Sequence, residues 1–163
     1  QAEAVRRRLD LVERCRPRLA ERAERGGMCL RVRLDVPDAP PILADPAAVE
    51  QILFNLVDNA CKYAAAQEGD KDDRRRIELW ARSGAAGTVE LAVCDRGPGI
   101  PRAERRRLFQ PFHKSARQAA HSAPGVGLGL ALSRRLARLM GGDLRLVDAA
   151  EGGACFALSL RRA

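Results

Sequence analysis

The stretch DPAAVEQILFNLVDNACKY, residues 45–63, decides the fold, because it predicts a long helix that buries one face. Asp45 is a carboxylate at the N-cap position, and Pro46 follows at the first helical position, where its missing N–H costs nothing. The apolar side chains recur at helical spacing and form one stripe. They are Val49, Ile52, Leu53, Leu56, Val57 and Ala60.

A second, polar stripe runs along the same helix. Asn55, Asn59, Lys62 and Tyr63 have i, i+4, i+7 and i+8 spacing, so they share one narrow strip roughly a quarter turn from the apolar one. Asparagine amide oxygens are hard ligands suited to Mg²⁺, and a lysine is a point charge for phosphate. The other interpretation is a hydrated helix face, with asparagine at some cost to helicity.

Further helices and strands are predicted on both sides of this helix from their hydrophobic periodicity. Helices are expected at 9–25, 102–108 and 130–140, and strands at 28–36, 42–43, 77–81, 89–93, 144–146 and 156–160. The apolar side chains expected to make the last helix amphipathic are Leu130, Leu132, Leu136, Leu139 and Met140. Residues 64–74 and 113–129 are expected to be loops, the second long enough to predict a lid over a ligand. The sum is an α+β fold, an antiparallel-rich sheet with helices on one face.

Composition narrows the class of protein. The 163 residues make one domain, and 46% hydrophobic with 31% charged residues excludes a disordered chain. No apolar run is long enough to cross a membrane. The net charge is 29 − 21 = +8, which fits either an arginine-biased hydrated surface or a polyanionic ligand. With 4% aromatic residues there is no stacking platform for bases, so no nucleic-acid partner is expected.

The chain has five cysteines with no metal-binding spacing: Cys15, Cys29, Cys61, Cys94 and Cys155. Four of them lie in apolar periodic segments, where a thiol behaves as a small buried hydrophobe. We therefore predict structural thiols in a reducing cytosol, rather than redox or metal-binding groups.

Two glycine-rich motifs carry further candidate chemistry. Asp95-Arg-Gly97-Pro-Gly99 places a carboxylate at a strand end beside backbone that a ligand can approach, though an ordinary turn has the same pattern. Gly125-Val-Gly127-Leu-Gly129-Leu130 opens a helix, where backbone N–H groups bind anions. Alone, neither motif is specific, and the second lacks the preceding strand of a dinucleotide fingerprint.

Taken in order, the motifs at 55–63, 95–100, 109–112 and 125–130 resemble the N, G1, F and G2 boxes of sensor histidine kinases. The resemblance runs from about Leu9 to Leu160. It implies the ATP-binding fold shared with the gyrase, Hsp90 and MutL families, a two-layer α/β sandwich with a mixed, mostly antiparallel sheet and a mobile lid. Residues 9–163 would form this domain, and residues 1–8 the tail of a dimerisation helix or a linker.

The resemblance also implies roles at the phosphate and base ends of ATP. Asn55 would bind Mg²⁺, Asn59 would lie at the phosphates or the waters of the metal, Lys62 would contact phosphate and Tyr63 would cover the adenine. Asp95 would accept from the adenine amine. The full set of implied nucleotide-binding residues is Asn55, Asn59, Lys62, Tyr63, Asp95, Gly97, Gly99, Ile100, Phe109, Phe112, Lys114, Gly125, Val126, Gly127, Leu128, Gly129 and Leu130.

Within that set, Phe109 and Phe112 would pack the base of the lid, and Lys114 would reach the terminal phosphates. The family commonly has arginine at the position of Lys114, so a point charge replaces a planar fork here. Asn55, Lys62 and Lys114 are the residues expected to act in phosphoryl transfer.

The resemblance also implies that the residue at position 55 distinguishes kinases from relatives that hydrolyse ATP. Relatives that hydrolyse ATP carry a glutamate four residues before the second N-box residue, and Asn55 stands there. The expected function is therefore donation of the γ-phosphoryl group of Mg-ATP to a histidine. His113 and His121 both lie in the predicted lid, so the acceptor histidine is expected on a dimerisation domain outside this chain. A degenerate nucleotide-binding or interaction module, and a gyrase- or Hsp90-like ATPase, remain the alternatives.

The resemblance implies the partners as well. They are the chain's own dimerisation and phosphoacceptor domain and, through it, a response regulator, in a homodimeric parent protein. The domain is expected in the cytoplasm, with the parent protein at the inner membrane.

Overall fold

The computed structural model describes residues 5–7, 10–34, 36, 41–64, 75–85, 87–111, 129–149 and 152–163. Helices are α1 (Asp10–Arg25), α2 (Pro46–Ala64), α3 (Arg102–Arg105) and α5 (Gly129–Leu139). Strands are β1 (Val5–Arg7), β2 (Cys29–Arg33), β3 (Ile42–Ala44), β4 (Arg76–Ser83), β5 (Thr88–Cys94), β6 (Asp143–Val147) and β7 (Cys155–Arg161).

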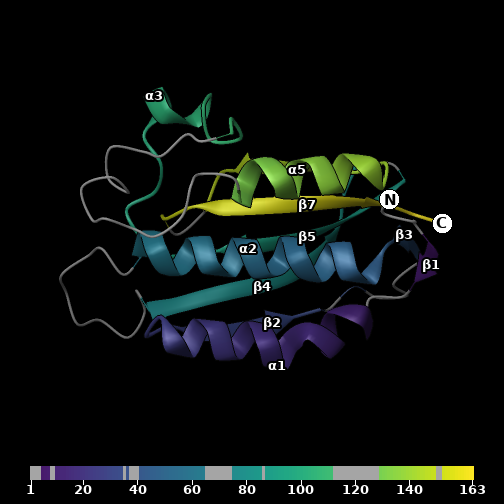
Figure 1. The fold of residues 1–163 in the computed structure, drawn as a ribbon, viewed down its shortest axis with the longest axis horizontal. Coiled ribbons are helices and arrows are strands. Elements are labelled where there is room, and N and C mark those ends of the chain that lie inside the picture. Colours follow the sequence, from purple (N-terminus) through teal and green to yellow (C-terminus); the bar gives the residue numbers. More distant parts are fainter. Residues whose placement is uncertain are drawn as a thin grey trace.

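The main sheet has the strand order β2-β4-β5-β7-β6. The β2–β4 pair is parallel, and the other three pairs are antiparallel. The helices α1, α2 and α5 lie side by side on one face, with α2 in the middle (Figure 1). This is the predicted two-layer α+β sandwich with a mixed sheet.

The sequence of α2 explains its central place. Asp45 Oδ1 accepts hydrogen bonds from the backbone N–H of Ala47 at 3.0 Å and of Ala48 at 3.4 Å, which caps the helix as predicted. The apolar stripe of α2 is fully buried against the inward side chains of the sheet. On β4 and β5 those inward residues are Ile77, Leu79, Ala81, Val89, Leu91 and Val93.

Two details at the ends of the fold differ from the sequence expectations. Val5–Arg7 pairs with β3 as an antiparallel strand, where no strand was predicted. On α5, Leu132 and Leu139 are 46% and 59% exposed, although both were expected in its apolar stripe. Ser133 and Ala137 take the buried face instead, because the small side chains let α5 lie close to α2.

The prediction that all five cysteines are thiols is wrong for two of them. Cys94 and Cys155 form a disulfide between β5 and β7. They are directly opposite in the strand register, although 61 residues separate them in sequence. Cys15 and Cys61 are buried thiols as expected, and Cys29 is exposed. Hydrophobic periodicity does not say which strands pair, so this bond could not be predicted from local sequence patterns.

Among the described helices, none combines the length and the apolar character that a membrane crossing requires.

Candidate functional site

The predicted carboxylate Asp95 lies directly after β5 and is 5% exposed. Side chains alternate along a strand, so Asp95 points to the helix-covered face of the sheet, whereas Cys94 before it points to the opposite face. The backbone N–H of Asp95 donates to the carbonyl of Ala154 at 2.9 Å, which extends the β5–β7 pairing by one residue. The register of the two strands therefore fixes the position of this carboxylate.

The carboxylate of Asp95 is bonded on one side only. Its Oδ1 accepts from the backbone N–H of Gly97 at 2.9 Å and of Ala154 at 3.2 Å. Among the described residues, Oδ2 has no hydrogen-bond donor. Burial raises the pKa of Asp95 above its ordinary value, and the bonds from Gly97 and Ala154 oppose that rise. The group is an acceptor with one oxygen held and the other available to a ligand.

Backbone packs tightly beside Asp95. A side chain on Gly153, at φ +80°, would lie 2.1 Å from the carbonyl oxygen of Asp95. Gly99, at φ +76°, faces the carbonyl of Gly153, where an added Cβ would lie at 3.2 Å. The predicted motif at 95–99 is thus pressed against the β6–β7 turn, which requires glycine for both conformation and space.

On α2, the amide of Asn55 is engaged at both ends. Its Nδ2 donates to Ser133 Oγ at 3.0 Å and, more weakly, to the carbonyl of Gly129 at 3.5 Å. Its Oδ1 accepts from Gln51 Nε2 at 3.0 Å. Ser133 is fully buried, so these bonds join α2 to the first turns of α5. Sequence analysis missed Ser133, although a serine inside an apolar helix stripe is the signal that identifies it.

Asn59 and Lys62 differ in their contacts. Asn59 is half-buried, and within the described part of the chain its amide has no hydrogen-bond partner. Lys62 Nζ pairs with Asp58 Oδ2 at 2.9 Å, and Arg22 of α1 pairs with Asp58 Oδ1 at 2.7 Å. The expected stripe is therefore intact in position, but Lys62 is held by a carboxylate that sequence analysis did not single out.

Burial by itself would raise the pKa of Asp58, but hydrogen bonds from Lys62 and Arg22 bring it below the usual range. The carboxylate stays ionised and anchors both cations.

The aromatic and apolar members of the predicted site lie at the edge of the core. The ring of Phe109 meets that of Phe156 edge to face at 6.2 Å, and the Arg134 guanidinium lies 4.6 Å from the Phe109 centroid. Ile100 is buried, and Leu130 packs against the core.

Several predicted residues lie outside the described residues. They are Phe112, Lys114, Gly125, Val126, Gly127 and Leu128, together with the side chain of Tyr63. Their roles stay predictions. No group of three or more His, Cys, Asp or Glu side chains in the described ranges is arranged to hold a metal ion. Magnesium at this site would therefore need ligands of another kind, such as an amide oxygen and phosphates.

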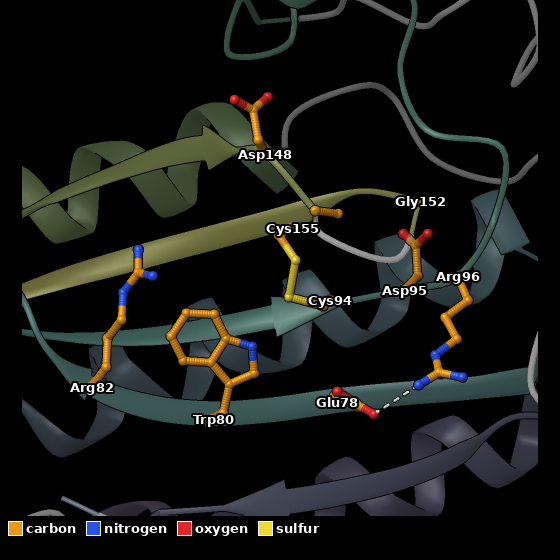
Figure 2. A pocket seen from close by; sticks show the side chains of 10 residues that line it. Glu78, Trp80, Arg82, Cys94, Asp95, Arg96, Asp148, Gly152 and Cys155 are labelled. Carbon is orange, nitrogen blue, oxygen red and sulfur yellow. Dashed lines mark hydrogen bonds and ion pairs between the residues drawn. A yellow bond between two sulfur atoms is a disulfide. The ribbon is translucent and has the colours of Figure 1, made fainter.

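A separate cavity of about 260 Å³ lies on the opposite face of the sheet. It is lined by Glu78, Trp80 and Arg82 of β4, by the disulfide, by Asp95 and Arg96, and by the turn at Asp148, Ala149 and Gly152 (Figure 2). Glu78 also pairs with Arg96 at 3.3 Å across the end of this cavity. Asp95 is the one lining residue that was predicted as part of a site.

The chain is similar in sequence to a known protein family and to individual sensor kinases. Residues 44–163 match the family model described as histidine kinase-, DNA gyrase B-, and HSP90-like ATPase. The chain is 38% identical over 141 residues to the virulence sensor protein BvgS of Bordetella bronchiseptica, covering 85% of this chain and 11% of BvgS. It is 33% identical over 132 residues to the adaptive-response sensory kinase SasA of Prochlorococcus marinus, covering 80% of this chain and 34% of SasA.

A solved structure shows the same arrangement. Full-length ShkA in complex with AMPPNP superposes with a TM-score of 0.77 and 28% identity, covering the whole of this chain and 32% of ShkA. The chain thus spans only a tenth to a third of the length of these relatives. Its sequence and fold agree with these relatives, and it belongs to the family of histidine kinase-, DNA gyrase B- and HSP90-like ATPases, with sensor histidine kinases as its relatives.

Proposed function

We propose that this chain is the catalytic domain of a two-component sensor histidine kinase, which binds Mg-ATP and donates the γ-phosphoryl group to a histidine on a dimerisation domain outside the chain. The observation that carries the proposal is the geometry of Asp95. One oxygen of this buried carboxylate is fixed by two backbone N–H groups, and the other is free to accept.

An adenine amine fits this arrangement. An ionised carboxylate only accepts hydrogen bonds, so it selects the exocyclic amine of adenine over the carbonyl that guanine has at the same place. Gly97 and Gly99 bring no side chains into the space beside it. The relative ShkA is seen in complex with AMPPNP, an ATP analogue, which supports the same ligand class here.

The side-chain amides of Asn55 and Asn59 on α2 are suited to bind the phosphate end of ATP and its metal ion. Bound Mg²⁺ would neutralise charge on the transferring phosphoryl group. The contacts favour Asn59 as the amide that offers its oxygen to the metal, because Asn55 Oδ1 already accepts from Gln51 and Asn55 Nδ2 is bonded to Ser133. Asn55 then orients α2 against α5. Its Oδ1 keeps a second lone pair beside the bond from Gln51, so it can also contact the metal, as expected from the resemblance. Lys62 reaches phosphate by leaving Asp58.

The residue at position 55 also favours phosphoryl transfer to histidine over hydrolysis of ATP. Asn55 has no proton-accepting group at neutral pH, so no side chain there serves as the base for an attacking water. By the resemblance, hydrolytic relatives carry a glutamate at this place. The sensor-kinase relatives support the transferase class as well.

Whole-protein features extend the proposal. The parent protein is a homodimer whose dimerisation domain carries the acceptor histidine and passes the phosphoryl group to a response regulator. The kinase domain faces the cytoplasm of a cell in which the parent lies at the inner membrane. Relatives named as sensor proteins and sensory kinases support this placement in signalling.

The test is phosphoryl transfer in two parts. Incubated alone with γ-labelled ATP, the chain should neither label itself nor turn over ATP rapidly. With the dimerisation domain of the same parent protein added, an acid-labile, base-stable phosphohistidine should form on that domain. Asn59→Ala should abolish the transfer. Rapid hydrolysis by the chain alone would instead place it with the ATPase relatives, and nucleotide binding without transfer would indicate a degenerate module.

A further inference from the structure

The Cys94–Cys155 bond lies on the sheet face opposite the helices α1, α2 and α5. It joins the last residue of β5 to the first residue of β7, one position before Asp95 on one strand and one position after Ala154 on the other. Both cysteines line the 260 Å³ cavity of that face, beside Trp80 (Figure 2). Asp95 and Arg96 line the same cavity, so a small molecule that reaches the sulfur atoms lies next to the residue that carries the proposed adenine contact.

The two sulfur atoms differ in access. Cys155 is 5% exposed, whereas Cys94 is only half-buried. Cys94 is thus the sulfur that an external reagent meets first, and Cys155 is the partner placed behind it. A half-exposed cysteine with a second cysteine opposite it is the arrangement of a reversible dithiol site, in which one sulfur exchanges and the other resolves.

We propose that Cys94 and Cys155 form a redox-active site that exchanges with low-molecular-weight thiols and disulfides, and that its oxidised form tightens adenine-nucleotide binding through Asp95. The second half of this inference rests on the function proposed above. The first half does not.

The exchange is a two-step reaction that balances. For a small disulfide RSSR, the Cys94 thiolate attacks one sulfur, forms a mixed disulfide and releases one RS⁻. The Cys155 thiolate then attacks the Cys94 sulfur, closes the Cys94–Cys155 bond and releases the second RS⁻. The two cysteine thiols have lost two protons and two electrons, and RSSR has become two RSH. Reduction by excess RSH is the reverse.

The disulfide is linked to the proposed nucleotide site by the hydrogen bonds between Asp95 and Ala154, the next residues of the two strands. Directly beyond the disulfide, the N–H of Asp95 donates to the Ala154 carbonyl, and the N–H of Ala154 donates back to Asp95 Oδ1. The bond keeps the Cα atoms of Cys94 and Cys155 4.1 Å apart. Reduction removes that constraint, so the ends of β5 and β7 open more readily and the carboxylate is less preorganised for a ligand.

The experiment uses the whole chain and compares its two redox states. The protein is equilibrated with reduced and oxidised glutathione over a range of ratios, quenched with an alkylating reagent and analysed by intact mass and peptide mapping. Calorimetry then measures Mg-ATP affinity in the fully oxidised and fully reduced forms. Cys94→Ala and Cys155→Ala remove the pair, and Cys29→Ala removes an exposed cysteine of β2 as the matched control.

We expect the oxidised chain to have three free thiols and a Cys94–Cys155 cross-link, and the reduced chain to have five. Oxidation should tighten Mg-ATP binding about three- to tenfold, the gain expected from preorganising one contact. The shift should persist in Cys29→Ala and vanish in Cys94→Ala. Glutathione adducts should accumulate on Cys94 in Cys155→Ala.

Two results would overturn the proposal. A pair that stays reduced in excess oxidised glutathione, or stays bonded in the folded chain under excess reduced glutathione, is not redox-active. Equal ATP affinities in the two forms would remove the coupling to Asp95. If neither form binds ATP while the thiols still exchange, the proposed function fails and the redox site stands.

Discussion

Asn55 of α2 donates a hydrogen bond from Nδ2 to the fully buried Oγ of Ser133 in α5, at 3.0 Å. This bond crosses between the helix that carries the polar stripe and the helix that begins where the glycine-rich motif ends. It ties the orientation of the Asn55 amide to the placement of α5. In the proposed site, Asn55 is therefore held by the fold rather than by the ligand.

Removing that tie should weaken nucleotide binding more than it weakens the fold. Ser133→Ala leaves Asn55 with the weaker bond from Nδ2 to Gly129 and the bond from Gln51 to Oδ1, so its amide is held less firmly. We expect Mg-ATP affinity to fall about fivefold and unfolding free energy to fall by about 1 kcal/mol, the usual net worth of one hydrogen bond. Ser83→Ala is the control, because Ser83 bonds only to exposed Arg162. Calorimetry and urea unfolding give the two quantities, and equal affinities in both variants would refute this role.

Gly153 offers a test with a matched neighbour. Gly152 and Gly153 have φ of +79° and +80°, so alanine strains the backbone equally at both. Only at Gly153 does the new Cβ meet the Asp95 carbonyl, at 2.1 Å, whereas at Gly152 it meets nothing within 4 Å. Gly152→Ala should cost about 1–2 kcal/mol of stability, the penalty for left-handed backbone.

Gly153→Ala should cost clearly more and should also reduce ATP affinity, because Asp95 must move. Thermal unfolding and calorimetry compare the two variants. If they behave alike, the packing of the β6–β7 turn does not position Asp95.

The acid sensitivity of the fold should depend on Asp58. Its pKa is lowered in the folded chain from the ordinary 3.8, so the unfolded chain takes up the proton first. The stabilisation from Lys62 and Arg22 is therefore present above pH 3.8 and is lost as the pH falls through the lower folded value. Asp58→Asn should cost about 1 kcal/mol at pH 7 and flatten the decline in acid.

The control is Asp10→Asn, since Asp10 pairs with Arg14 at 3.7 Å on an exposed helix face. Urea unfolding between pH 2 and 7 measures both variants. A decline in acid that is unchanged in Asp58→Asn would show that other carboxylates cause it.

Nucleotide affinity should also fall in acid, but from a higher pH, because burial raises the pKa of Asp95. As the pH falls through this raised value, the folded chain takes up a proton before the unfolded chain does. Folding gains stability from that protonation, but the carboxylate no longer serves as an ionised acceptor. ATP affinity should therefore start to fall at a pH above 3.8. Subtracting the profile of Asp95→Asn removes the titration of the nucleotide, and parallel profiles would exclude Asp95 as the titrating group.

Local patterns in the sequence were enough for the layered architecture. The helical period of residues 45–63 and the alternation in β4 and β5 each specify an element and its buried face, and the structure confirms them. Local pattern says little about pairing between distant segments. The strand formed by Val5–Arg7 and the disulfide at Cys94 both depend on partners tens of residues away.

In the candidate site as well, residues within contiguous motifs could be predicted, and residues that act through contacts between distant elements could not. Asp95 and Asn55 were found from spacing and resemblance, because each lies in a motif of contiguous residues. Ser133 and Asp58 were missed, since a hydrogen bond between helices and an ion pair to α1 leave no trace in a short window. Leu132 and Leu139 were placed on the wrong face of α5, because an apolar side chain in a helix does not itself say which neighbour covers it.

The central claim is that Asp95 selects adenine nucleotides, and calorimetry of Mg-ATP and Mg-GTP with the wild-type chain and Asp95→Asn tests it most directly. We predict that ATP and ADP bind to the wild type and that GTP does not. Asp95→Asn should lose about 1–3 kcal/mol of ATP binding, because a neutral amide replaces a charge-assisted acceptor. Equal binding of ATP and GTP by the wild type, or undiminished ATP binding by the variant, would contradict the account.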